Sequence, residues 1–397
     1  MGEHMETLEL TGSDFEEDRY ARLRLIPWWD QARLKNATIM VVGAGAIGNE
    51  LIKNLTLLGI GRILVYDMDA IESTNLTRSV LYRAKDVGRY KAEVAAERAR
   101  EMNPDVKAKA FIANIIDDVG LGVFRRMDVV LGGLDNREAR LAINQSCYKV
   151  DRPWIDGAIE ALNGFARVFI PGQGACYECT MTETDWMLIN KRKSCALLTH
   201  AQMAEGKIPT TPTSSSIIAG IQVQEMLKLL HADRNLPTLA GKGYVFNGLT
   251  HDSYVVEYQR KEDCMSHDTY ETILEKPWSV KTVTLKAVLA EIRSQLGETA
   301  VVDFDRDIAT RAKCACGHCK DLFTPVHKLK GHMLTCPECG SQMSFESIHS
   351  LKGDEDFLEK TPAQIGIPPL HIIGGRVGIN TTYFEFTADE AEVFENL

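Results

Sequence analysis

Hydrophobic and polar positions alternate in blocks along the first part of the chain, and these blocks predict alternating strands and helices. Residues 39–42 form a short apolar, β-branched run, which is typical of a strand buried on both faces of a parallel sheet. An amphipathic pattern follows between Ile47 and Leu58 and predicts a helix that ends at Gly59. Strand-like, helix-like, strand-like, strand-like and helix-like runs come next, at residues 62–66, 91–102, 107–112, 128–134 and 137–149. This alternation predicts an α/β fold with a Rossmann-like, doubly wound and mainly parallel sheet.

The pattern changes after residue 154. Short apolar runs between 154 and 171 predict further strands, 214–230 predicts a long helix, and 244–258 predicts two strands around a turn at Asn247-Gly248. Between them, residues 180–213 lack strong periodicity and predict a long crossover loop, a kind of segment that is commonly functional in compact domains.

These patterns divide the chain into three regions. Residues 1–18 are mostly polar and predict a flexible arm, whereas 19–269 carry the alternating pattern of the main domain. Residues 270–397 predict a separate α+β extension, with strand, helix and strand between 280 and 305 and a cysteine-rich segment at 311–345.

Composition narrows the functional classes. The chain has 397 residues, is 45% hydrophobic and carries a net charge of −10, which disfavours a general nucleic-acid binder. It has no apolar run long enough to span a membrane and no apolar signal region at its start. Most of its ten cysteines fall into metal-type spacings, so we expect a protein of the reducing cytoplasm with bound zinc.

Three glycines predict a nucleotide site. Gly43, Gly45 and Gly48 follow the first strand with the spacing G-x-G-x-x-G and open the first long helix. A tight glycine turn at a helix N-terminus presents backbone N–H groups and the helix dipole to an anion. Asp67 ends the next strand, where such folds place an acidic residue for the nucleotide.

Polar residues at the expected strand ends indicate what the nucleotide is used for. A hydride-transfer enzyme would keep an open nicotinamide pocket at these strand ends. This chain instead has Asn75, Arg78, Lys91 and Asp135 there. Cations suit a triphosphate and a carboxylate suits Mg²⁺, so the set favours phosphoryl or nucleotidyl transfer.

The cysteine spacings predict two zinc sites. Cys316-x-x-Cys319 and Cys336-x-x-Cys339 are two knuckles typical of a structural zinc ribbon, with Cys314 and His318 as alternative ligands. Four protein ligands leave no open position for water, so this site is expected to be structural. The second site pairs two distant segments, and its predicted ligands are Cys176, Cys179, Cys264 and His267.

Cys195 remains outside both sets. It lies in the crossover loop after Lys191-Arg192-Lys193, and nearby cations favour the nucleophilic thiolate. These residues alone leave a nucleophile and an inert loop cysteine equally open.

At this point the chain resembles the adenylyltransferases grouped with MoeB, ThiF and the ubiquitin-activating enzymes. The resemblance covers residues 19 to 267 and rests on ordered motifs: Gly43–Gly48, Asp67-x-Asp69, Asn75-Leu76-x-Arg78, Gly88–Glu93, Leu134–Asn136, Cys176-x-x-Cys179 and Ile218–Glu225. The short loop around Cys195 is most similar to that of compact, homodimeric activators. His267 in place of a last zinc cysteine, and the zinc-ribbon extension, depart from the MoeB and ThiF pattern.

The resemblance implies ATP and Mg²⁺ in the glycine cradle. Asp67 would hold the ribose, Asn75, Arg78 and Lys91 the phosphates, and Asp135 the Mg²⁺. Asn114 and Asn136 match positions near the nucleotide. Arg22 matches an arginine that reaches the partner subunit's ATP in family dimers, with Arg19 and Arg24 as rivals for that role.

The resemblance also implies the reaction. The substrate would be a ubiquitin-like protein with a C-terminal glycine, which is adenylated, joined to Cys195 as a thioester and passed to a conjugating enzyme. A sulfur-transfer adenylyltransferase without an obligatory thioester is the alternative. An NAD-dependent oxidoreductase would leave Arg78, Lys91 and Asp135 unexplained, and a non-catalytic scaffold would need none of the ATP residues.

Overall fold

The computed structural model describes residues 18–194, 209–395 and 397, and it contains two sheets. The larger sheet has eight strands in the order β3-β2-β1-β4-β5-β6-β7-β8, parallel from β3 to β5 and antiparallel beyond β5. These strands are β1 (Thr38–Val42), β2 (Arg62–Tyr66), β3 (Lys107–Phe111), β4 (Val129–Gly132), β5 (Trp154–Glu160), β6 (Asn163–Phe169), β7 (Lys242–Asn247) and β8 (Asp252–Glu257). The expectation of a mixed α/β fold with a large, parallel-rich sheet is confirmed.

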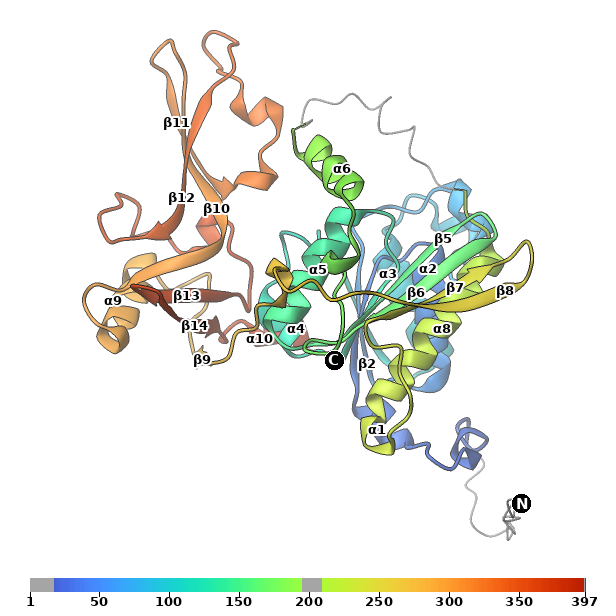
Figure 1. Ribbon diagram of the computed structural model, residues 1–397. Helices are drawn as coiled ribbons and strands as arrows, with labels where there is room; N and C mark the ends of the chain where they lie inside the picture. The colour runs from blue at the N-terminus through green and yellow to red at the C-terminus, as the bar shows by residue number, and fades with distance from the viewer. Residues whose placement is uncertain (1–17, 195–208, 396) are drawn as a thin grey trace.

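Helices cover both faces of this sheet (Figure 1). The helices of the described part are α1 (Gln31–Asn36), α2 (Ala46–Leu58), α3 (Lys91–Met102), α4 (Leu121–Arg125), α5 (Arg137–Lys149), α6 (Glu183–Ser194), α8 (Pro212–Leu230), α9 (Leu285–Leu296) and α10 (Glu390–Phe394). Because side chains alternate along a strand, Ile39 and Val41 of β1 pack with α2, α3 and α8, whereas Met40 and Val42 pack with α4 and α5. Both faces of β1 are therefore buried, as its apolar run predicts.

The second sheet is built from the C-terminal residues. Its strands are β9 (Ile273–Lys276), β10 (Val301–Lys313), β11 (Cys319–Pro325), β12 (Ser344–Leu351), β13 (Ile372–Val377) and β14 (Asn380–Phe386). Their order is β11-β10-β13-β14-β9, with β12 pairing β10, and α9 contributes Leu285, Val288 and Ile292 to their core. The expected strand near residue 280 is wrong, because β9 ends at Lys276.

The second sheet packs directly on the helices that cover the larger sheet, beside α4 and α5 (Figure 1). Leu370 and Ile372 belong to the same buried cluster as Phe124 of α4, and the Gly122 N–H donates to the Leu370 carbonyl at 2.7 Å. Glu385 is fully buried against the guanidinium groups of Arg125 and Arg126. The shared apolar cluster joins the two sheets, and the two guanidinium groups offset the cost of burying the Glu385 carboxylate.

The crossover segment differs from expectation. The sequence predicts a loop over 180–213, but residues 183–194 form α6. This helix lacks a strong apolar stripe, so its sequence gives no clear helical periodicity. Cys195 lies outside the described residues. None of the helices in the described ranges has the length and apolar content that a membrane span requires.

Candidate nucleotide site and metal centres

The carboxyl ends of β1 and β4 meet a large cavity. The chain crosses from β1 to β2 on one side and reaches β4 on the other, so the connections diverge at this point of the sheet. Such a divergence leaves a crevice that binds ligands in open α/β sheets. The cavity has a volume of about 1130 Å³ and is lined by the segments that follow β1, β2, β3 and β4.

Each glycine of the loop after β1 has its own structural reason. Gly43 has a φ of 91°, and a Cβ there would lie 2.5 Å from the Gly133 carbonyl oxygen. A Cβ on Gly48 would lie 1.9 Å from the Gly43 carbonyl oxygen, so Gly48 closes the turn against the helix. Gly45 is different, because a Cβ there meets no atom within 4 Å and the residue lines the cavity. Gly45 is the N-cap of α2 and offers no side chain to it, which leaves this helix start open to an anion.

Asp67 at the end of β2 is fixed by the same loop. Its Oδ2 accepts the Ala44 N–H at 2.7 Å and its Oδ1 accepts the Asp69 N–H at 2.8 Å. Burial raises the pKa of this carboxyl, against the lowering effect of these hydrogen bonds and of Lys91. A partly desolvated acceptor beside a glycine loop suits the hydroxyl groups of a ribose.

Two cations and an amide lie along the wall after β2. Lys91 Nζ is 2.8 Å from Asp69 Oδ2, and Arg78 Nη1 donates to the Thr74 carbonyl at 2.7 Å. Asn75 Oδ1 accepts the Glu72 N–H at 2.9 Å. All three residues line the cavity, so positive charge is already placed where a polyphosphate would lie.

The remaining polar lining residues follow two other strands, Asp135 and Asn136 after β4 and Asn114 after β3. Asn136 caps α5 by accepting the Ala139 N–H at 2.7 Å, and Asn114 Oδ1 accepts the Ile116 N–H at 3.0 Å. Asp135 is exposed to the cavity and makes no recorded hydrogen bond or ion pair with the described residues. An unpaired carboxylate in a cavity that also holds Arg78 and Lys91 fits the oxygen ligands that Mg²⁺ prefers.

The cavity thus unites most of the residues that the sequence singles out. Gly43, Gly45, Asp67, Asn75, Arg78, Lys91, Asn114, Asp135 and Asn136 line it, and Gly48 supports the turn behind it. Sequence reasoning missed Arg140, which also lines the wall and donates from Nε to Asp156 Oδ1 at 2.8 Å. The sequence does contain an indication of this position, because Arg140 follows Asn136 by one helical turn and so lies on the same side of the helix.

Arg22 is not among the cavity-lining residues of its own chain. Its rivals are engaged elsewhere, since Arg19 donates to the Met102 carbonyl at 3.3 Å and Arg24 pairs with Asp18. Arg22 is exposed and has no recorded side-chain partner in the described residues.

The first cysteine group comes together as the sequence suggests. Ligand atoms of Cys176, Cys179, Cys264 and His267 all lie within 4.8 Å of one another. Cys176 Sγ is 3.5 Å from Cys264 Sγ, and Cys179 Sγ is 3.3 Å from His267 Nε2. Tetrahedral zinc with bonds of about 2.3 Å to sulfur separates its ligands by about 3.8 Å, so the four groups fit a metal ion.

The second group differs in one ligand. The predicted set contains Cys319, whereas the structure gathers Cys314, Cys316, Cys336 and Cys339 within 4.8 Å. Cys319 begins β11 directly opposite Lys313, and its exposed Sγ lies 3.7 Å from the Gly317 carbonyl.

A tight turn explains why Cys314 and not Cys319 belongs to the group. The Cys314 N–H donates to the His318 carbonyl at 2.8 Å and directs Cys314 toward the group. Hydrogen bonds from Ser341 lower the pKa of Cys339 to about 6, which favours a thiolate ligand.

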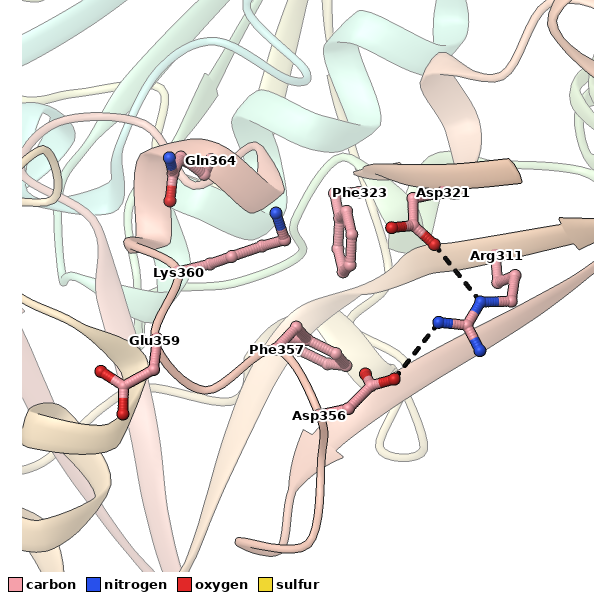
Figure 2. Close-up of a pocket in the computed structure, with 8 residues that line it drawn as sticks. All are labelled: Arg311, Asp321, Phe323, Asp356, Phe357, Glu359, Lys360 and Gln364. Carbon is pink, nitrogen blue, oxygen red and sulfur yellow. Dashed lines mark hydrogen bonds and ion pairs between the residues drawn. The ribbon is translucent and has the colours of Figure 1, made fainter. Parts of the chain in front are cut away.

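A smaller cavity of about 460 Å³ lies on the second sheet (Figure 2). Figure 2 shows Arg311 between Asp321 and Asp356, at 3.3 and 3.2 Å. Lys360 Nζ lies 4.3 Å from the centre of the Phe323 ring. This cavity is smaller and its lining includes neither a glycine loop nor a helix start such as that of α2, so the larger cavity is the stronger candidate site.

Residues 17–266 match the sequence profile of the ThiF family, which is more than half of the chain. The chain belongs to the ThiF family. The ThiF-family region ends one residue before His267 and contains every residue that lines the larger cavity.

Two kinds of enzyme are among the curated relatives. Ubiquitin-like modifier-activating enzyme 5 of Arabidopsis thaliana is 28% identical over 249 residues, covering 56% of this chain and 55% of the relative. The sulfur carrier protein adenylyltransferase of Thermus thermophilus is 37% identical over 172 residues, covering 41% and 64%. The chain therefore spans between about half and two thirds of the length of these relatives.

Solved structures support the fold. The crystal structure of E. coli MccB with ATP has a TM-score of 0.53 at 24% identity, covering 64% of this chain and 75% of that chain. At this identity the similarity shows the fold alone.

Proposed function

We propose that this protein is an ATP- and Mg²⁺-dependent adenylyltransferase that activates the C-terminal carboxylate of a ubiquitin-like protein. The single observation that supports this most is the cavity in which the glycine loop, Asp67, Arg78, Lys91 and Asp135 meet. Family membership and two groups of adenylating or modifier-activating relatives agree with it. We assign the adenylation role to residues 19–269 and treat 270–397 as an extension.

In the proposed reaction, a carboxylate oxygen of the substrate's terminal glycine attacks the α-phosphorus of ATP. The bond from that phosphorus to the bridging oxygen breaks, and pyrophosphate leaves with its electron pair. Arg78 and Lys91 offset the charge on the leaving group, and Asp67 orients the ribose. Asp135 is the residue that would hold Mg²⁺, which supplies further charge neutralisation at the phosphates.

The second proposed step uses Cys195. Its thiol loses a proton to solvent, the thiolate attacks the acyl carbon, and AMP leaves to give a thioester that a conjugating enzyme accepts. Three cations precede Cys195 in the sequence, and such neighbours favour the thiolate.

A sulfur-carrier adenylyltransferase is the second candidate. The relative from Thermus thermophilus, 37% identical over 172 residues, keeps it as the alternative. In that case adenylation suffices and the carrier ends as a thiocarboxylate.

Isotope exchange between pyrophosphate and ATP tests the first step. The wild-type protein should catalyse exchange only when the cognate modifier is present, and Asp135→Ala should reduce it by orders of magnitude without unfolding. Normal exchange in that variant would contradict the role of Asp135.

The second step is tested by trapping. Wild-type protein with ATP, Mg²⁺ and modifier should form a thiol-labile adduct that Cys195→Ala abolishes, while exchange persists in the variant. An intact adduct in Cys195→Ala would refute the thioester assignment. Mass spectrometry that finds a thiocarboxylate on the modifier would favour sulfur transfer.

We also propose two structural zinc ions per chain, one in each cysteine group, because each group offers four ligand atoms with suitable spacing. Their expected role is to stabilise the chain segments that they join.

A further inference from the structure

The wall of the nucleotide cavity continues into two acidic residues that face the C-terminal sheet. Residues 113–116 line the cavity, and Asp117 and Asp118 follow them directly. Asn114 Nδ2 donates to Asp117 Oδ2 at 3.2 Å, and the Asn114 N–H donates to Asp118 Oδ2 at 2.9 Å. The two carboxylates therefore fix both the side chain and the backbone of a cavity-lining asparagine.

The other side of each carboxylate is occupied by the C-terminal extension. Asp117 Oδ1 pairs with His327 Nε2 when that imidazole is protonated, and Asp118 Oδ1 pairs with Lys328 Nζ. Arg306 of β10 donates from Nη1 to the Asp117 carbonyl at 3.1 Å. Three basic side chains of the C-terminal extension, one from β10 and two from the segment after β11, thus contact the loop Asn114–Asp118.

The second cysteine group flanks the segment that carries two of these side chains. His327 and Lys328 lie in a short 3₁₀ helix, η8 (Val326–Lys328), between the two halves of the group. Cys314 and Cys316 precede this segment, Cys336 and Cys339 follow it, and their ligand atoms lie together. A metal ion bound by these four cysteines would join both ends of this segment and lower its conformational freedom, which would help to hold η8 in place.

We propose that the C-terminal extension completes the nucleotide site, with Asp117 and Asp118 as positioning residues that hold Asn114 for the ligand. This inference rests on the proposed nucleotide-binding function. A loop held in its binding conformation before the ligand arrives loses less conformational entropy on binding. The extension therefore raises ATP affinity without contacting ATP.

Calorimetric titration of the full-length protein with Mg-ATP tests this proposal. His327→Gln and Lys328→Met should each weaken ATP binding by about two- to fivefold, the effect of one partly exposed ion pair. Their matched controls are His332→Gln and Lys330→Met, which make the same changes at exposed residues of the same segment without recorded side-chain contacts among the described residues. The controls should bind ATP like the wild type.

Two further measurements separate positioning from a general structural effect. In pyrophosphate exchange, Lys328→Met should raise the KM for ATP and leave kcat and the KM for the modifier unchanged, and Lys328→Arg should restore the KM. His327→Gln should have little additional effect in an Asp117→Asn background, because its partner charge is already absent. His327 and Lys328 side chains are 33% and 32% exposed, so their replacement leaves the apolar core intact.

The failures are distinguishable. A wild-type protein that does not bind Mg-ATP contradicts the proposed function. A wild-type protein that binds it, with His327→Gln and Lys328→Met equal to their controls, overturns the positioning role alone. The positioning role is also overturned if ATP affinity falls only together with the melting temperature, or if the effects of Asp117→Asn and His327→Gln on ATP affinity simply add.

Discussion

At the residue scale, the three glycines of the nucleotide loop differ in what they prevent. Gly43 and Gly48 avoid collisions with backbone carbonyls, whereas Gly45 keeps the helix start accessible from the cavity. One G-x-G-x-x-G motif therefore combines two structural roles with one proposed binding role.

Substitutions at Gly45 and Gly48 should separate these roles. Gly48→Ala places a Cβ 1.9 Å from the Gly43 carbonyl oxygen, so it should destabilise the fold by about 1–3 kcal/mol, as overpacking does. Gly45→Val should leave the melting temperature nearly unchanged and weaken ATP binding by about tenfold or more, because its side chain occupies the anion cradle. Thermal unfolding and ATP titration of both variants check this, and equal melting temperatures would contradict it.

Asp67 should give ATP binding a characteristic pH dependence. Burial raises the pKa of its carboxyl, so on acidification it takes up a proton at a higher pH than an ordinary aspartate does. Only the ionised form accepts hydrogen bonds from both ribose hydroxyls, so its contribution is present above the raised pKa and is lost as the pH falls through it. Asp67→Asn should weaken binding by about tenfold at neutral pH.

The ratio of the two dissociation constants, variant over wild type, isolates Asp67 from the titration of ATP itself. This ratio should shrink as the pH falls, since the protonated wild type also lacks the anion. A ratio that stays constant between neutral and acidic pH would show that Asp67 does not act as an ionised acceptor.

Most of the cavity residues could be predicted because they lie at the ends of easily recognised parallel strands. The glycine spacing and the runs after β2 and β4 place Asp67, Arg78 and Asp135 at one edge of the sheet without any tertiary information. Asp117 could not be assigned in this way. Its contacts with Arg306 and His327 join residues about 200 positions apart, and no local pattern encodes them.

At the element scale, the cysteine-rich hairpin shows where motif spacing is insufficient. Cys316-x-x-Cys319 has the usual knuckle spacing, but Cys319 already belongs to the β10–β11 ladder. The Cys319 side chain, which pairs with Lys313, lies on the exposed face of that ladder. Cys314 is therefore the fourth member of the cysteine group. The helix α6 also could not be predicted from the sequence, because its residues form no apolar stripe with helical periodicity.

Metal analysis of two serine variants should distinguish Cys314 from Cys319. The wild-type protein is expected to retain two zinc ions per chain, and Cys314→Ser should retain one, because its thiolate is part of the second group. Cys319→Ser makes the same chemical change at an exposed cysteine outside the group and should retain both. Zinc is measured by mass spectrometry of protein dialysed against a mild chelator. Loss of zinc from Cys319→Ser with retention in Cys314→Ser would restore the ligand set that spacing alone suggests.

At the scale of the whole molecule, the position of Arg22 raises the question of a second subunit. The cavity of one chain contains the proposed magnesium residue Asp135 but not Arg22. Arg19 and Arg24 have partners within their own chain, whereas the exposed Arg22 has none recorded among the described residues. An arginine that completes the phosphate site from a partner subunit would explain this arrangement in a homodimer.

Complementation between two inactive variants decides whether Arg22 acts in trans. Arg22→Ala and Asp135→Ala should each lose most pyrophosphate exchange. If subunits are unfolded, mixed in equal amounts and refolded, half of the dimers should carry one chain of each kind. In these dimers the site with an intact Asp135 receives the intact Arg22 of the other chain, so activity should return to about a quarter of the wild-type level. With Arg22 acting in cis, no site in the mixture has both residues and activity stays at the level of the separate variants. Arg24→Ala mixed with Asp135→Ala is the matched control. If Arg24→Ala loses exchange on its own and this mixture recovers about a quarter of it, while Arg22→Ala is active, the role belongs to Arg24.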